Sequence, residues 1–323
     1  MGYAIGTLTK GGGDDCHYQL LAVIKTLAEA NGWVTLRYDT GTANHELILQ
    51  GEGLSGTEEI FVGFQCYQNI TSDYYNINCG VFVGYVAENS FSSQPGGKYY
   101  STPGHNNSIT YFISCNPQRI TGGLRVGTPV YETFYVGKGM PYFRPGEYPS
   151  FLICAAMANS GSSARFSSTT QTFPFAGYRS DESNNKLSIR DQSGNWIRAN
   201  CYPFTQGDSK LNSLAGPQGS GTMVPAGDSY QIEPIIMYQD KDSIGDYGPS
   251  NVFGEFDGVY FCTGFNNAVE NVIQVGGSSV IDQSGLSVVE AVDDIISVGG
   301  RALVMIQNVY RTEWHEFVAM EMV

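Results

Sequence analysis

The chain has 323 residues, a length that allows two domains or one large β domain. Only 15% of the residues are charged, while 40 are glycine and 21 are tyrosine, a composition that disfavours helical bundles and favours many short strands joined by turns. The net charge of −14 argues against nucleic acid or an anionic membrane surface as a partner, because binding to either rests on Lys and Arg.

The sequence gives no sign of a membrane span or of a signal peptide. The apolar run closest to the required length of about 18 residues, Leu20–Ala30, is short and is broken by Lys25 and Glu29. The first fifteen residues lack the basic start and the apolar stretch of a secretory signal. We therefore expect no membrane span and synthesis in a cytoplasm.

The seven cysteines are odd in number, widely spread and without a C-x-x-C pair. This pattern indicates neither a zinc site nor the disulfide framework of a small secreted protein, so we interpret them as buried thiols. Cys16 and His17 are neighbours on a predicted helix and point to different faces, which disfavours a shared metal ion.

The first predicted element is an α-helix that follows a run of three glycines. Leu20, Leu21, Ile24 and Leu27 recur at helical spacing, which predicts one buried stripe. Asp14 or Asp15 is the expected N-cap, and Gly32 is the expected left-handed end.

From residue 33 onward the pattern changes to short strands separated by Gly, Pro, Asn and Asp. In the first half of the chain we predict strands at Trp33–Tyr38, Glu46–Gln50, Glu59–Gln65, Tyr74–Val86, Ser108–Ser114 and Leu124–Val136. In the second half we predict strands at Lys186–Arg190, Asn195–Arg198, Gln231–Tyr238, Phe256–Thr263, Leu303–Val309 and Phe317–Met322. The strands at Lys186–Arg190 and Asn195–Arg198 are joined by a hairpin turn at 191–194.

These elements predict a mainly β fold of antiparallel β-sandwich type modules, with one N-terminal α-helix and long loops. Crossover helices have no room between successive strands. We predict an N-terminal segment and helix at 1–32, a first β region at 33–156 and a second at 157–323, or one interleaved domain. Residues 157–170 read as a linker, and the polar segment 205–229 reads as a flexible arm that orders against a partner.

The motifs of common enzymes are missing from the sequence. It has no G-x-S-x-G and no P-loop ending, which leaves only a triad assembled from distant residues. Glu255 and Asp257 share a strand face, as the two carboxylates of a glycosidase would require, but a solvated strand edge is the favoured interpretation. The acidic segment at 240–245 departs from a calcium loop and is interpreted as a turn. We predict no enzyme activity, no metal and no cofactor.

Aromatic side chains concentrate in the segment 142–149, where proline residues restrict the loop. Tyr142, Phe143 and Tyr148 are candidate interface anchors, and Arg144 adds a forked hydrogen-bond donor. The competing interpretation is that this loop closes an internal edge of a sandwich. The sequence leaves both open.

Four stretches carry a resemblance to a family of virion structural proteins of tailed bacteriophages. They are Trp33–Thr40 (WVTLRYDT), Leu47–Ile60 (LILQGEGLSGTEEI), Gly254–Tyr260 (GEFDGVY) and Gln307–Thr312 (QNVYRT). The resemblance implies a non-enzymatic tail component at the neck and collar or at the baseplate, present in several copies in the virion after synthesis in the host bacterial cytoplasm. Its partners would be other phage structural proteins and copies of itself.

The main alternative to a structural role is a receptor- or carbohydrate-binding tail protein that uses exposed Tyr and Trp as stacking surfaces. A glycan-degrading tail enzyme is a further alternative, and it would need a convergent pair of carboxylates in a cleft.

Overall fold

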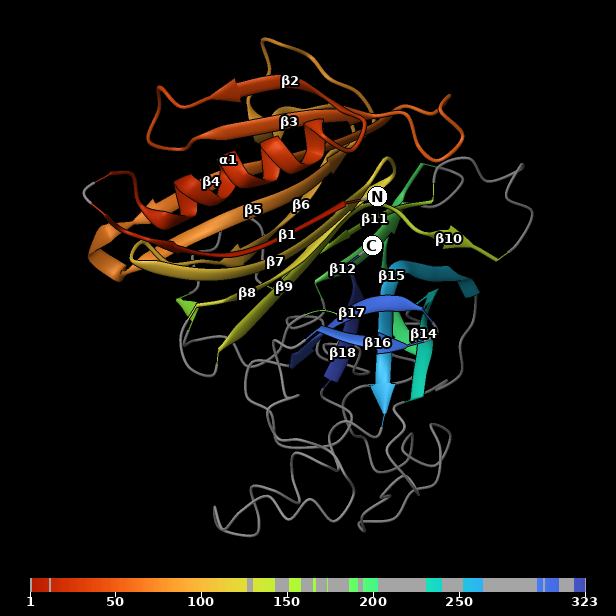
Figure 1. Cartoon of the computed structure of the whole chain (residues 1–323). Helices are drawn as coiled ribbons and strands as arrows, with labels where there is room; N and C mark the ends of the chain where they lie inside the picture. The colour runs from red at the N-terminus through yellow and green to blue at the C-terminus, as the bar shows by residue number, and fades with distance from the viewer. Residues whose placement is uncertain are drawn as a thin grey trace, which may run out of the picture.

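The computed structural model describes residues 2–11, 13–126, 130–142, 151–157, 165–166, 173, 186–190, 194–202, 231–239, 252–263, 295–298, 300–307 and 317–322. In these residues one α-helix accompanies antiparallel strands, drawn in Figure 1. The prediction of a mainly β fold with one N-terminal helix is confirmed.

The smaller sheet is a five-stranded meander. Each strand pairs antiparallel with the next along the chain, as the short, turn-rich connections require. Its strands are β2 (Trp33–Asp39), β3 (Glu46–Gly51), β4 (Ile60–Asn69), β5 (Tyr74–Phe82) and β6 (Lys98–Pro103). Short 3-10 turns at Ile70–Ser72 and Phe91–Ser93 interrupt the connections.

The larger sheet has 13 strands and begins with β1 (Gly2–Thr9), which pairs with β7 (Ser108–Asn116). The path continues through β8 (Arg119–Arg125), β9 (Tyr131–Lys138), β11 (Leu152–Ala155), β12 (Leu187–Arg190) and β13 (Trp196–Tyr202). It ends with β14 (Gln231–Gln239), β15 (Val252–Thr263), β18 (Phe317–Glu321), β17 (Arg301–Gln307) and β16 (Ile295–Val298), while β10 (Met140–Pro141) pairs with β15.

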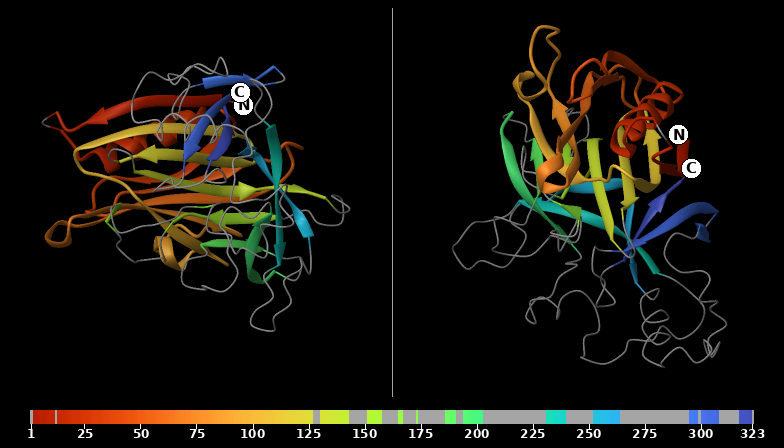
Figure 2. Two further views of the ribbon diagram at one scale, coloured as in Figure 1. Left: turned by 90° about the horizontal axis from the view of Figure 1, so that it is seen from below. Right: turned by 90° about the vertical axis from the view of Figure 1, so that its left-hand side faces the viewer.

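The larger sheet changes direction at β13, so the described residues form three β layers. Residues 196–198 of β13 pair with β12, while residues 199–202 pair with β14. As a result, β14 and β15 cross the direction of β7–β9 at a steep angle (Figure 2). The strands from β7 to β12 form the middle layer, with the five-stranded sheet on one face and the β14–β18 strands on the other.

Two hydrophobic cores lie on opposite faces of the middle layer. In β11, Leu152 and Cys154 belong to the core shared with the five-stranded sheet, while Ile153 and Ala155 belong to the core shared with β14–β18. Successive side chains of a strand point to opposite faces, so a strand between two cores is apolar at every position. Each fully buried Leu or Ile side chain contributes roughly 1.5–3 kcal/mol to folding.

The helix α1 (Cys16–Glu29) packs against β1 and β7 and against the five-stranded sheet, and it buries Leu20, Leu21 and Ile24 of the predicted stripe, while Leu27 is half-buried. Asp15 occupies the N-cap position, but its carboxylate pairs with Lys10 Nζ at 2.5 Å and does not cap the helix. The left-handed glycine expected just after the helix is Gly32, with a φ of +89°.

Some strand predictions are wrong. Leu124–Val136 is not one strand but contains the end of β8 and the start of β9, and Val126 N donates to Val130 O between them. The predictions also lacked β1, β6, β10, β11 and β16.

The sequence predicted a boundary between two β regions at residues 156 and 157. The middle layer contains strands from both sides of this boundary, because β11 (before it) pairs with β9 and also with β12 (after it). Of the predicted linker 157–170, only residues 157, 165 and 166 are described. Met157 N donates to Ser101 O at 3.1 Å, and Arg165 Nε pairs with Asp73 Oδ2 at 2.6 Å, so these residues contact the first β region. The predicted arm at 205–229 lies outside the described residues.

Candidate functional site: a polar junction and an exposed tyrosine

The turn between β7 and β8, residues 116–118, is bonded through its backbone to two layers of the molecule. Trp33 Nε1 donates to Asn116 O at 2.8 Å, and Gly53 N donates to Pro117 O at 3.1 Å. Lys138 N donates to Gln118 O at 2.8 Å. Three consecutive carbonyls of one turn therefore hold the five-stranded sheet and the middle layer together.

The side chains of the same turn reach the third layer. Asn116 Nδ2 and Gln118 Nε2 donate to Asp257 Oδ2, on β15, at 2.6 and 2.7 Å. Asn116 Oδ1 accepts from the backbone N–H groups of Gln118 and Arg119, both at 3.0 Å, which fixes the turn. The carboxylate of Asp257 is thus an acceptor for donors from a hairpin 139 to 141 residues away in the chain.

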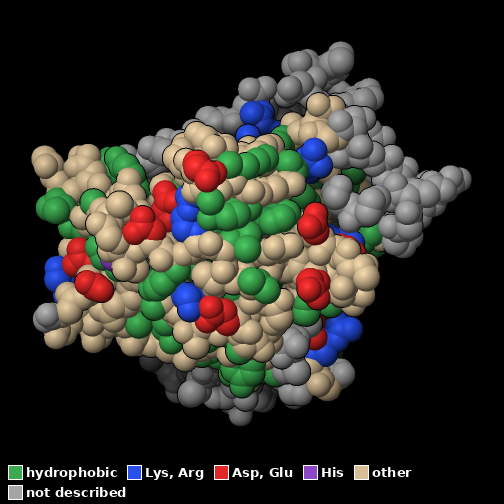
Figure 3. All heavy atoms as spheres, turned by 90° about the horizontal axis from the view of Figure 1, so that it is seen from above, with side chains coloured by type: hydrophobic (Ala, Val, Ile, Leu, Met, Phe, Trp, Pro, Cys, Tyr) green, Lys and Arg blue, Asp and Glu red, His purple; other side chains and the backbone are tan. Residues whose placement is uncertain are grey.

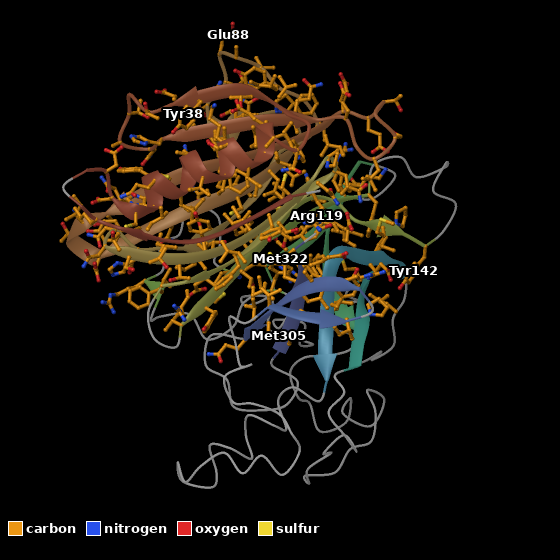
Figure 4. The ribbon with its side chains drawn as sticks, viewed as in Figure 1. Tyr38, Glu88, Arg119, Tyr142, Met305 and Met322 are labelled. Carbon is orange, nitrogen blue, oxygen red and sulfur yellow. The ribbon has the colours of Figure 1, made fainter. Side chains whose placement is uncertain are left out.

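Arg119 supplies the charge that balances this carboxylate. Its side chain is completely buried, its Nη1 donates to Ser114 Oγ at 2.8 Å, and its Nε lies 3.7 Å from Asp257 Oδ2. Gly258 has a φ of +73°, and a Cβ there would lie 2.3 Å from Arg119 Nη2, so only glycine fits. Figure 4 labels Arg119 near the middle of the molecule.

Tyr135 completes the cluster from β9. Its hydroxyl donates to Lys138 O at 2.8 Å and accepts from Asp257 N at 3.2 Å. Burial, followed by the charge of Asp257, raises the pKa of Tyr135 far above its usual value, so the hydroxyl stays protonated. We call Asn116, Gln118, Arg119, Tyr135 and Asp257 the polar junction.

The polar junction corrects one sequence interpretation. Asp257 does not lie on a solvated strand edge, because its side chain is only 14% exposed and accepts from two amides beside a buried guanidinium. A buried carboxylate needs such partners, since burying it unpaired would cost several kcal/mol. Glu255, two residues earlier, has a different partner, the hydroxyl of Tyr142. The two carboxylates are thus each engaged by their own donors.

Tyr142 is the one predicted interface residue within the described part of the chain, while Phe143, Arg144 and Tyr148 lie outside it. Its side chain is 47% exposed, and its hydroxyl donates to Glu255 Oε2 at 2.7 Å. Burial and then Glu255 raise its pKa well above the usual value. It follows the short strand β10, whose Met140 is opposite Glu255 in the register, and Figure 4 places Tyr142 at the side of the molecule.

A second cluster, which the sequence analysis missed, gathers three histidines among tyrosines. His17 is fully buried, with ring centroids 4.0 Å from Tyr18 and 5.4 Å from Tyr75. Tyr18 stacks on His45 at 4.0 Å, and Tyr75 lies 6.4 Å from His105. Within the described residues neither nitrogen of the His17 ring has a hydrogen-bond partner, and burial lowers the pKa of His17 to about 4. Only the long-range packing of residues 17, 45, 75 and 105 brings this cluster together.

The six cysteines whose side chains are described are buried free thiols, which confirms the interpretation for those six. Among the described residues no group of three or more His, Cys, Asp or Glu could hold a metal ion, and no helix there could cross a membrane.

Three of the four stretches that carry the family resemblance meet at the polar junction. Trp33 and Gly53 donate to the turn, and Asp257 accepts from it. These residues are therefore explained by the construction of the fold. A comparison with protein-family models and a comparison with curated proteins both find no match for this chain.

Proposed function

We propose that the protein is a non-enzymatic structural component of a tailed-bacteriophage virion, assembling in several copies in the tail apparatus at the neck and collar or at the baseplate. Its partners are other structural proteins of the phage and copies of itself, and it enters the particle after synthesis in the host bacterial cytoplasm.

The observation that carries the proposal is that residues from three of the four resembling stretches hold the layers of the fold together. Trp33, Gly53 and Asp257 use their polar groups to tie three layers into one body. A component that transmits or bears load needs such cross-layer ties, whereas an enzyme of the carboxylate type needs its carboxylates free to meet substrate. Asp257 and Glu255 are both engaged within the protein.

The test is to locate and count the chain in intact particles of the phage that encodes it. We expect density for this fold at the neck or baseplate, and quantitative mass spectrometry to give several copies per virion relative to a tail protein of known stoichiometry. A single copy per particle, or absence from purified virions, would refute the proposal.

A second measurement tests the contact residues. The double variant Tyr142→Ala with Phe143→Ala is expected to fold and yet to enter particles poorly, because it removes two aromatic anchors. Val34→Ala, at another exposed apolar position, is the matched control. Normal incorporation of the well-folded double variant would exclude this loop as the contact.

A carbohydrate-binding role is the second candidate, and exposed aromatic side chains favour it. Tyr3, Tyr38 and Tyr142 are 50%, 40% and 47% exposed. On the side seen in Figure 3, where Figure 4 places Tyr38, apolar side chains gather between acidic and basic ones. A glycan array separates the two roles, since a structural component binds no glycan selectively. Turnover of host polysaccharide that Asp257→Asn abolishes would instead establish an enzyme.

A further inference from the structure

The four strands at the ends of the two sheets differ in how their open edges are protected. The edge strand β2 carries Arg37 and a register shift between Thr35 and Arg37, and β6 carries Lys98 and Pro103. The edge strand β16 has only four residues. Charges, prolines, bulges and shortness are the usual means of preventing edge-to-edge pairing.

The strand β1 has none of these features. It is eight residues long (GYAIGTLT), contains no charge and no proline, and pairs with β7 in unbroken register from Gly2 to Thr9. Its side chains alternate between half-buried and exposed, with Tyr3 50% and Ile5 38% exposed. It is therefore the sheet end that is built to accept another strand.

The backbone groups on the open side of β1 can be assigned from the ladder. Lys10 N donates to Asn107 O, so Lys10 belongs to a hydrogen-bonded pair with β7. Because such pairs alternate along an antiparallel ladder, the N–H and C=O groups of Tyr3, Ile5 and Thr7 point away from β7. Within the described residues, Thr9 O on that side accepts from Gln19 Nε2 at 3.4 Å, and those three residues have no backbone bond to another strand.

We infer that β1 pairs antiparallel with β1 of a second copy of this chain, about a two-fold axis at Ile5. In this register Ile5 lies opposite Ile5 of the second copy and Tyr3 lies opposite Thr7, so that three outward residues of each strand exchange backbone hydrogen bonds. The opposed side chains are aromatic with β-branched and β-branched with β-branched, pairs that stabilise antiparallel strands.

Charge is the reason to choose a second copy as the occupant. Each chain carries a net charge of −14, so two copies approach at least cost where the contact has no charge. The eight residues of β1 meet that condition. The helix α1 packs beside β1, and its Lys25 and Glu29 are already paired with each other.

This inference does not rest on the proposed function, since the two-fold contact uses β1 and not Tyr142. A chain that is monomeric in solution would overturn this inference and leave the proposed function standing. Absence of the chain from virions would overturn the proposed function and leave this inference standing.

The experiment is disulfide trapping of the full chain. We expect Ile5→Cys to form a disulfide-linked dimer under mild oxidation, because residues opposite each other in a hydrogen-bonded pair have Cα atoms about 5.5 Å apart, within the range a disulfide spans. Tyr3→Cys and Thr7→Cys should cross-link with each other when mixed and poorly alone. Val34→Cys, an exposed position on the edge strand β2, is the control; Val34 is 57% exposed and Ile5 38%, so exposure alone would favour cross-linking of the control. Cross-linking of Ile5→Cys no faster than of Val34→Cys would overturn the register.

Sedimentation equilibrium of the wild-type chain, without introduced cysteines, provides the second measurement. We expect a dimer whose affinity falls by roughly 30- to 100-fold in Ile5→Pro, the effect of losing two backbone hydrogen bonds across the axis. Proline at this position removes only an outward N–H, so the β1–β7 ladder and the thermal unfolding temperature should be retained. A monomeric wild-type chain at about 100 μM, a concentration at which even weak specific dimers associate, or a folded Ile5→Pro dimer of unchanged affinity, would each refute the inference.

Discussion

At the scale of single residues, the polar junction depends on one carboxylate that serves donors from two elements. Asp257 accepts from Asn116 and Gln118 and balances the buried charge of Arg119. A buried ion pair adds little net stability compared with an apolar replacement, but removing one partner leaves the other charge buried. The cost of breaking the junction is therefore much larger than the free energy gained by forming it.

We expect Asp257→Ala to lower the free energy of unfolding by about 3–5 kcal/mol, because the Arg119 guanidinium loses its carboxylate and two amides lose their acceptor. Urea denaturation measures this change. Glu255→Gln is the control, and it should cost about 1 kcal/mol or less, because it alters only the partly exposed bond from Tyr142. Equal losses in the two variants would contradict the role given to Asp257.

The histidine cluster predicts a pH dependence of stability. Burial lowers the pKa of His17 from 6.5 to about 4, so the unfolded chain binds this proton more readily than the folded one. The stabilisation is complete above pH 6.5 and is lost as the pH falls towards 4, by about 3 kcal/mol in total. His17→Phe should flatten this part of the stability curve, measured by urea denaturation from pH 8 to 4. Parallel curves for the variant and the wild type would exclude His17 as the titrating group.

At the scale of elements, the middle layer is packed on both faces, and small residues set how closely the layers approach. On β8, a Cβ at Gly123 would lie 2.3 Å from Cδ1 at the end of the Ile306 side chain on β17, so a larger residue must displace that side chain. The glycine is therefore favoured by close packing between two layers and not by its backbone angles.

Gly123→Ala is expected to cost about 1–3 kcal/mol through overpacking. Ile306→Val removes the Cδ1 atom that a new Cβ would meet, so the double variant Gly123→Ala with Ile306→Val should be more stable than Gly123→Ala alone. Thermal or urea unfolding of the four proteins gives the coupling free energy of this cycle. Strictly additive losses would mean that the two layers do not meet at these atoms.

Much of the secondary structure could be predicted from the sequence, and the exceptions have physical causes. The strand β4 has contiguous β-branched and aromatic residues, and β3 has the apolar run Leu47–Leu49, both between turn signals, so their pattern is clear. The strand β1 instead alternates Gly and Ala with larger residues, because Gly6 makes room for the hydroxyl of Tyr111. A pattern of small and large residues carries no polarity signal, and the strand was missed.

The polar junction could not be predicted for a different reason. Asp257 and Asn116 are 141 residues apart, and nothing in either segment indicates the other. A local reading gives Asp257 the most common role of an acidic residue between glycines, a turn or an exposed edge. Only the packing of β15 against the β7–β8 turn makes it a largely buried acceptor, with 14% of its side chain exposed.

At the scale of the whole molecule, the two cores share the strands β9 and β11, so neither core can be exposed without disrupting the other. We expect the described body to unfold in one transition in spite of its size. The thiols of Cys79 and Cys201 lie in different cores and should become reactive at the same urea concentration. Two separate midpoints for these thiols would instead indicate two independently stable β regions.

The burial of β9 along its whole length also predicts how the sequence can diverge. In β1 only every second side chain is half-buried, so related chains should vary there with a period of two residues. In β9 all eight residues are buried, and acceptable changes at each depend on a compensating change in one of two neighbouring layers. Divergence should therefore be slow and correlated in β9, and at Tyr3, Ile5 and Thr7 it should be limited by the paired strand of the second copy and not by the core.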